Sequence, residues 1–224
     1  NFLYVLDKTI SKNTVIVILS DHGEMFAKHG RFGRAGGVRG TLYDDVVHVP
    51  LMMKIPSLKG TMVHGLVEMI DVMPTLLYIL NVSQPKQMQG RNVVPLIKGE
   101  KRDIHSYVFA GAKFGLQIGR PSWFIYRSQS ISESIRSKEW KLIHEIIYDE
   151  EGKLEQEVYE LYNLKDDPDE LRNLALEQSD RTLELQGVLK SWKDKATSYD
   201  AQNISSPQLL PPDIIEQGRK HGYW

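Results

Sequence analysis

The sequence has 224 residues, of which 41% are hydrophobic and 25% are charged. These values are typical of a globular protein and exclude a wholly disordered chain. Because 28 lysines and arginines nearly balance 29 aspartates and glutamates, the net charge of −1 argues against nucleic acid or an anionic membrane as a partner. The sequence contains no cysteine, which excludes disulfides, thiolate metal sites and a cysteine nucleophile within this chain.

No apolar run approaches the roughly 20 residues needed to cross a bilayer, so we predict no membrane span. The chain opens at Asn1 in a helical pattern, with neither an initiator methionine nor a signal-peptide pattern. We therefore expect a fragment of a longer protein, and the sequence leaves its compartment open.

The first half of the chain has the pattern of an α/β domain. Residues 14–19 are a continuous, mostly β-branched run, which predicts a parallel strand buried on both faces. Residues 30–40 contain five glycines and three arginines, a composition that favours a surface loop close to a ligand. Residues 47–55 predict a second strand, with Pro50 near its start and Pro56 directly after it, and residues 70–80 predict a strand end followed by a helix. This order of strand, loop, strand and helix is typical of α/β proteins.

Beyond about residue 103 the pattern changes to short strands rich in aromatic residues, which predict a small antiparallel sheet. We place these strands at residues 106–109, 123–127, 138–147 and 156–162. An acidic turn at residues 149–152 predicts a hairpin. Asp167 and Pro168 predict the start of a short helix, and a longer amphipathic helix from Ser179 should pack on the sheet.

The most informative feature for function is Asp21-His22, which directly follows the first strand. Ligands of open α/β sheets bind where strands end, and a carboxylate beside an imidazole offers one oxygen and one nitrogen ligand to a divalent cation. The alternative is structural, with Asp21 capping the following turn and His22 buried and hydrogen-bonded.

Five segments of the sequence, taken in order, resemble the second half of the sulfatase family within the alkaline phosphatase superfamily. They cover residues 14–24 with 29–30, 41–45 with 48–51, 70–77, 89–99 and 160–174. Any one of them is weakly specific, whereas the five together are specific. The resemblance implies that the fold is α/β, with part of an alkaline-phosphatase-like mixed sheet and its helices, followed by a small C-terminal antiparallel β-sheet and helix subdomain.

The resemblance implies that Asp21 and His22 bind the divalent cation that lies under the sulfate ester. This cation is usually calcium, and many family members carry asparagine where this chain has His22. Imidazole suits manganese or zinc better than calcium, so manganese, magnesium and zinc remain alternatives.

A basic residue in the next loop, usually lysine, contacts the sulfate oxygens in this family. This chain has no lysine between His29 and Tyr43, and the spacing favours either Arg34 or Arg39. Arginine can bind a tetrahedral oxyanion through two parallel donors, so either residue could replace the lysine. His29 could donate a proton to the leaving oxygen, or it could simply hold the glycine-rich turn.

The family nucleophile is a formylglycine made from cysteine or serine in a Cys/Ser-x-Pro-x-Arg motif, and this chain contains no such motif. We therefore expect the nucleophile in an N-terminal half of the same protein, and we expect this chain alone to be inactive. We assign residues 1–102 to the catalytic α/β domain, residues 103–200 to the small sheet and helix subdomain, and residues 201–224 to an extended tail.

The predicted substrate is a sulfate ester of a small molecule or carbohydrate. One alternative keeps the fold and changes the reaction to phosphonate or phosphate ester hydrolysis, because phosphoryl and sulfuryl groups are both tetrahedral. A second alternative is a non-catalytic binding module that retains the fold. The nucleophile motif of the missing half and cation binding by the full protein would discriminate among the three.

Overall fold

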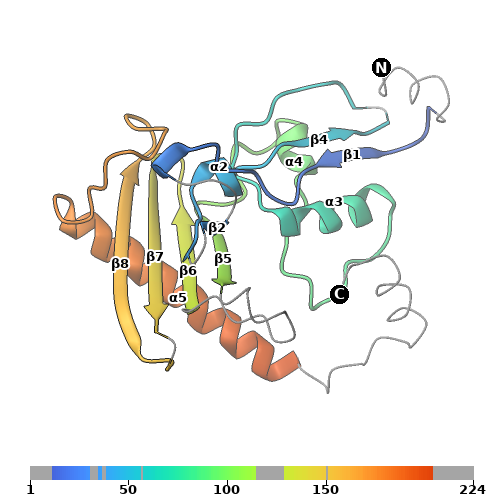
Figure 1. Cartoon of the computed structure of the whole chain (residues 1–224). Coiled ribbons are helices and arrows are strands. Elements are labelled where there is room, and N and C mark those ends of the chain that lie inside the picture. The colour runs from blue at the N-terminus through green and yellow to red at the C-terminus, as the bar shows by residue number, and fades with distance from the viewer. Residues whose placement is uncertain are drawn as a thin grey trace, which may run out of the picture. The chain divides into compact units, whose positions relative to one another are not determined.

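The computed structural model describes residues 12–30, 35–36, 39–56, 58–114, 129–149 and 151–203 (Figure 1). By its internal contacts the chain divides into two units, residues 1–189 and 190–224. The strands are β1 (Ile16–Leu19), β2 (Ala35–Gly36), β3 (Arg39–Gly40), β4 (Leu51–Lys54), β5 (Val108–Phe114), β6 (Gln129–Arg136), β7 (Trp140–Tyr148) and β8 (Leu154–Asn163). The helices are η1 (Lys28–Gly30), α2 (Asp44–Val47), η2 (Met69–Asp71), α3 (Val72–Ile79), α4 (Val94–Ile97) and α5 (Ser179–Asn203).

The largest sheet is antiparallel and has the order β5-β6-β7-β8 (Figure 1). Strands β5, β7 and β8 confirm three of the four predicted strands, and the fourth, at residues 123–127, lies outside the described residues. The predicted hairpin between β7 and β8 is confirmed, with Gly152 at a φ of 79° in the turn. The sequence does not predict strand β6, because its buried positions Ser130, Ser132 and Ser134 give no apolar alternation.

The first predicted strand is present, but its predicted pairing is wrong. β1 pairs antiparallel with β4, with Ile16 opposite Lys54 and Leu19 opposite Leu51. Among the described residues β4 is its only neighbour, and Leu19 is 40% exposed. The β-branched run correctly indicates a strand with two apolar faces, but the strand lies in a two-stranded sheet and is only partly covered.

Of two helices predicted from the sequence, the one near residue 72 is present with a different start, and the short one at Asp167 is absent. The predicted helix near residue 72 is α3, but a 3-10 turn, η2, precedes it in place of a strand end. The short helix predicted at Asp167 is absent, since residues 164–166 and 168–169 form turns. The Asp167 carboxylate instead accepts the backbone N–H groups of Leu171 and Arg172, at 3.1 and 2.8 Å, as the cap of a longer turn.

The predicted long helix is α5, and Leu185 and Leu189 on its apolar stripe are buried. Near its start, the guanidinium of Arg181 lies over the Trp140 ring of β7, 5.6 Å from the ring centre. The tail predicted from residue 201 lies mostly outside the described residues, which end with α5. No helix among the described residues is long and apolar enough to cross a membrane.

One cluster of buried side chains packs the segment after β1 against the large sheet. Its members come from residues 25–46 and from β7, β8 and the turn after β8: Met25, Leu42, Tyr43, Val46, Ile143, Tyr162 and Leu164. The loop that carries Asp21 and His22 is therefore followed directly by chain that is anchored on the C-terminal sheet.

Candidate metal site

The turn after β1 is built on a close backbone approach. The amide nitrogen of Gly23 donates a hydrogen bond to the carbonyl oxygen of Val46 in α2, at 2.7 Å. A Cβ atom at Gly23 would lie 2.0 Å from the carbonyl oxygen of Asp45, so only glycine fits at this position. Ser20 closes the turn from the other side, its hydroxyl donating to the carbonyl oxygen of His22 at 2.6 Å.

Asp21 and His22 point to a common region at the end of β1. Oδ1 of Asp21 lies 3.7 Å from Nε2 of His22, and the two side chains are 85% and 33% exposed. Nδ1 of His22 lies 2.8 Å from the carbonyl oxygen of Gly23. Because a carbonyl oxygen can only accept, Nδ1 carries the hydrogen in this contact, and Nε2 of the neutral ring is left with a free lone pair.

His29 lies on the following turn with a φ of 52°, in the left-handed region. Its ring stacks on Tyr43, with ring centres 3.9 Å apart and planes at 5°. The Tyr43 hydroxyl donates to Glu160 of β8 at 2.9 Å. Among the described residues, Nε2 of His29 is buried without a hydrogen-bond partner.

The side chains of the two candidate arginines lie outside the part of the chain that the structure describes, so their distances to Asp21 and His22 are not defined. Arg34 lies outside the described residues, and Arg39 begins the two-residue strand β3, with a side chain that is likewise outside the description. Their roles stay predictions.

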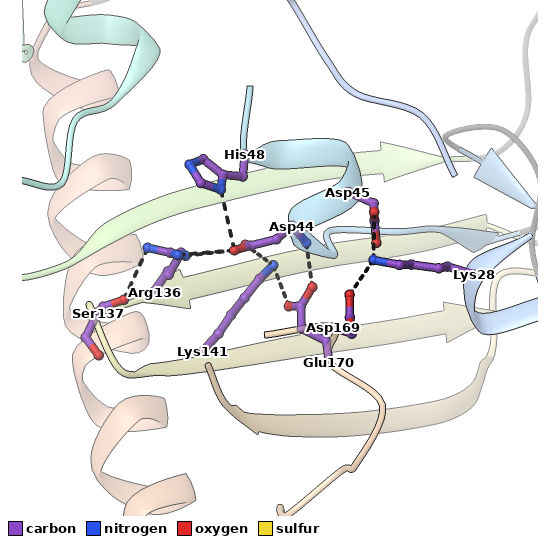
Figure 2. A network of polar contacts seen from close by, with 9 residues as sticks. All are labelled: Lys28, Asp44, Asp45, His48, Arg136, Ser137, Lys141, Asp169 and Glu170. Atoms are coloured by element: carbon purple, nitrogen blue, oxygen red, sulfur yellow. Dashed lines mark hydrogen bonds and ion pairs between the residues drawn. The ribbon is translucent and has the colours of Figure 1, made fainter. Parts of the chain in front are cut away.

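A buried network of charges holds α2 against the large sheet (Figure 2). The ammonium group of Lys141, on β7, is fully buried and lies 2.8 Å from Oδ1 of Asp44 and 2.7 Å from Oε1 of Glu170. Glu170 also accepts the backbone N–H of Asp44 at 2.6 Å. Arg136, on β6, contacts the other carboxylate oxygen of Asp44 through Nε and a terminal nitrogen, each at 3.2 Å.

The network shifts the pKa values of its two carboxylates in opposite directions. Burial alone would raise the pKa of Asp44, but Lys141 and Arg136 outweigh it, and the net pKa is below its ordinary value of 3.8. Burial raises the pKa of Glu170 above 4.5, and Lys141 offsets this shift only in part. Asp44 is therefore the firmly ionised partner of the buried lysine.

A second contact joins the turn of η1 to the same region. Nζ of Lys28 lies 3.2 Å from a carboxylate oxygen of Asp45 and 2.7 Å from one of Asp169 (Figure 2). These groups are considerably more exposed than Lys141, so we expect this contact to contribute little to stability.

Glu68, Asp71 and His105 form a second polar group, away from Asp21 and His22 in sequence. Their potential ligand atoms lie within 4.8 Å of one another, so the group could hold a metal ion. Both oxygens of Asp71 are already used, since they accept the N–H of Arg91 at 2.7 Å, the N–H of Glu68 at 2.8 Å and a contact from Nε2 of His105 at 2.8 Å. This group therefore already joins three segments without a metal.

A family model decides the relationship of the chain to known proteins. The model for the C-terminal part of N-sulphoglucosamine sulphohydrolase matches residues 38–196. The chain belongs to this sulfatase family. Mouse arylsulfatase K is 28% identical over 195 residues, which cover 84% of this chain and 31% of that protein. The Escherichia coli sulfatase YidJ, described as uncharacterized, is 24% identical over 165 residues, or 73% of this chain and 28% of that protein.

Solved sulfatase structures share the fold. BT4656, in complex with its substrate D-glucosamine-2-N,6-O-disulfate, matches with a TM-score of 0.66 and 21% identity, over 93% of this chain and 39% of that one. A Bacteroides thetaiotaomicron protein assigned to the sulfatases matches with a TM-score of 0.66 and 24% identity, over 88% of this chain and 40% of that one. The sulfatase-family chain thus spans about a third of the length of the curated relatives it matches.

Sequence reasoning missed the roles of Lys141, Glu170 and His105. One signal was available for Lys141, since it lies in a strand whose alternate residues, Ile143 and Ile147, are apolar and buried. A lysine on the buried face of a strand requires carboxylate partners. The sequence could not identify those partners, because they are distant along the chain.

Proposed function

We propose that this chain is the C-terminal portion of a metal-dependent sulfatase that hydrolyses sulfate esters. In this proposal Asp21 and His22 supply part of the cation site, and the formylglycine nucleophile lies in an N-terminal half of the same protein. Membership of the sulfatase family and the match to a structure with a sulfated sugar support this function. The observation that most directly supports this cation site is the 3.7 Å separation of Asp21 Oδ1 and His22 Nε2.

The donor set fits a divalent cation. Two ligands at roughly 2.0 to 2.5 Å from one ion lie about 3 to 4 Å apart, which matches the observed separation. The contact of His22 Nδ1 with the Gly23 carbonyl leaves Nε2 free to coordinate, as the outer partners of metal-binding histidines commonly do. Calcium is the family expectation, the imidazole nitrogen keeps manganese and zinc as alternatives, and the Asp21 carboxylate keeps magnesium as another. When bound, the cation would offset negative charge on the sulfate oxygens.

The remaining roles follow from charge and position in the loop. Arg34 or Arg39 would bind the sulfate oxygens through two parallel N–H groups. His29 would donate a proton to the leaving alcohol oxygen. Its stacking on Tyr43 supports a fixed ring orientation, because a parallel stack at 3.9 Å restricts rotation of the imidazole.

Exposed apolar side chains support an N-terminal half as partner. On β1, β4 and α3, Leu19 is 40% exposed, Met52 is 56% exposed and Met73 is 52% exposed. Because Met52 is paired with Ile18 and Leu19 is paired with Leu51, Met52 and Leu19 lie on opposite faces of the two-stranded sheet. Exposed apolar side chains on both faces are typical of a sheet that packs against further chain. The N-terminal half, which would also supply the remaining metal ligands, is the partner we propose for these surfaces.

The test uses the full-length protein, purified with and without a chelator. Calcium binding is measured by titration calorimetry, and turnover is measured on an aryl sulfate, an aryl phosphate and an aryl phosphonate. We expect cation-dependent turnover of the sulfate, and loss of both binding and turnover in Asp21→Ala. Asp103→Ala, which removes an exposed carboxylate paired with Lys138, is the matched control and should behave as wild type.

Three results would contradict the proposal in different ways. Preference for the phosphate or phosphonate would replace the sulfatase with the related ester hydrolase. Absence of both cation binding and turnover would favour a non-catalytic binding module. Wild-type binding and turnover in Asp21→Ala would remove Asp21 from the site.

A further inference from the structure

We propose that Lys141 is a positioning residue for the Asp21-His22 site and acts through Asp44 and α2. This inference rests on the proposed function and adds to it, because it makes the C-terminal sheet part of what holds the cation site in place. Lys141 lies on β7, in a part of the chain that contains none of the residues predicted to touch the substrate or the cation.

The first step is the cost of burying Lys141. Its side chain has no solvent exposure, and a buried ammonium group is tolerated only when paired carboxylates compensate for lost hydration. Asp44 and Glu170 provide this compensation at 2.8 and 2.7 Å. An apolar residue of similar volume would fill the same space without that requirement. The ion pair therefore specifies where Asp44 lies more than it adds net stability.

The second step is that α2 depends on these contacts. α2 has only four residues, and helices this short gain little stability from their own hydrogen bonds. Glu170 binds the backbone N–H of Asp44, while Lys141 and Arg136 bind its carboxylate (Figure 2). Glu170 itself has a φ of 57°, unusual for a residue with a side chain, and its contacts with Lys141 and Asp44 offset that backbone strain.

The third step links α2 to the site. The carbonyl oxygen of Val46 accepts the N–H of Gly23, the residue directly after His22. The carbonyl oxygen of Asp45 also packs against Gly23, closely enough to exclude a Cβ atom. A shift of α2 would therefore move the Gly23 backbone, whose carbonyl oxygen orients the His22 ring. A metal ligand that loses its orienting partner binds the cation more weakly, so the shift should lower the affinity of the site for the cation.

The experiment uses the full-length protein and two substitutions. Lys141→Met removes the charge and keeps an unbranched side chain. The double variant Lys141→Met/Glu170→Gln also removes the carboxylate left without its lysine, and leaves Asp44 paired with Arg136. Lys138→Met is the matched control, since Lys138 is 51% exposed and pairs with Asp103 at the same end of the sheet. Calcium affinity, turnover against calcium concentration and thermal unfolding are measured for each.

We expect the calcium Kd to rise about 10- to 100-fold in both Lys141 variants, the range found when residues that orient metal ligands are replaced. Turnover at saturating calcium should return close to the wild-type value, which a merely structural loss would not allow. Lys138→Met should match wild type. If Lys141→Met does not fold, the double variant carries the test and is expected to show the same rise in Kd, whereas Glu170→Gln, which keeps the pair between Lys141 and Asp44, should show a clearly smaller rise.

Two results would overturn the inference while leaving the proposed function intact. One is a wild-type calcium Kd in the folded Lys141 variants when Asp21→Ala has lost binding. The other is an equal loss of turnover at every calcium concentration, which would assign Lys141 to stability alone. A wild-type protein that binds no cation would instead reject the proposed function, and this inference with it.

Discussion

The amide nitrogen of Gly23 lies 2.7 Å from the carbonyl oxygen of Val46 and donates a hydrogen bond to it. This single contact joins the turn that carries Asp21 and His22 to α2, and α2 is in turn bound to the large sheet by Asp44. The geometry of the candidate site is thus set by residues from both halves of the chain.

Gly23→Ala tests how tight this contact is. The added methyl group would lie 2.0 Å from the Asp45 carbonyl oxygen, so the turn and α2 must separate. We expect the free energy of unfolding to fall by about 1 to 3 kcal/mol, as for overpacking in a core. Urea unfolding checks this, with Gly60→Ala as control because a methyl group at Gly60 would meet no atom within 4 Å. Equal losses in the two variants would show that the contact is loose.

Thr75→Val tests the hydrogen bonds that the Thr75 side chain in α3 makes with Asp71 and Val93. Thr75 is fully buried, its hydroxyl donates to the carbonyl oxygen of Asp71 at 2.6 Å, and it accepts the N–H of Val93 at 3.0 Å. Valine has the same shape but leaves that N–H buried and unpaired, which costs about 1 to 3 kcal/mol. Chemical denaturation should show this loss, and the same change at exposed Thr61 should be nearly neutral. A neutral effect at Thr75 would mean that water replaces the hydroxyl.

Glu68→Gln tests a dependence of stability on pH. Burial raises the pKa of Glu68 above its ordinary value of 4.5, and the nearby Asp71 raises it further, although hydrogen bonding from Phe109 opposes the shift. The Glu68 carboxyl therefore holds its proton more tightly in the folded state than in the unfolded state. The contribution of this proton to the free energy of unfolding is present below pH 4.5 and is lost as pH rises through the raised pKa of Glu68.

The measurement for Glu68 is the urea midpoint at a series of pH values that starts below its ordinary pKa of 4.5 and ends at neutral pH. Wild type should lose stability relative to Glu68→Gln as the pH rises. Glu100→Gln, at a side chain that is 58% exposed, should retain the wild-type profile. Parallel profiles for wild type and Glu68→Gln would contradict the prediction.

His22→Asn tests the choice of cation in the full-length protein. The substitution replaces a nitrogen ligand with an amide oxygen, and calcium prefers oxygen ligands whereas zinc and manganese accept imidazole. We expect the ratio of calcium to zinc affinity to rise about tenfold or more, because an oxygen ligand at position 22 favours calcium over zinc. Competition titration measures it. An unchanged ratio would indicate that His22 does not coordinate the cation.

The fold can be predicted where burial leaves a regular pattern in the sequence. Strands β7 and β8 are predictable because apolar and aromatic residues recur along them, and α5 because its apolar stripe is regular. β6 escapes prediction since serines occupy its buried positions, and the predicted pairing of β1 is wrong because a β-branched run reports burial but not strand direction.

The candidate site can be predicted only where its residues are adjacent in sequence. Asp21 and His22 follow an abrupt strand end, and the resemblance to sulfatases adds their role. The residues that hold α2 cannot be found this way. Lys141 lies 97 positions from Asp44, and Glu170 lies 126 positions from it, so no local pattern records the pairing.

The distance along the chain between Asp44 and Lys141 also has a practical consequence for anyone producing this protein in pieces. A shortened polypeptide that starts near residue 103 would retain the whole four-stranded sheet, yet Lys141 would keep only Glu170 as a counter-ion. Such a piece should expose the surface that α2 covers and be prone to aggregation. Recombinant fragments intended for crystallisation should therefore begin ahead of β1.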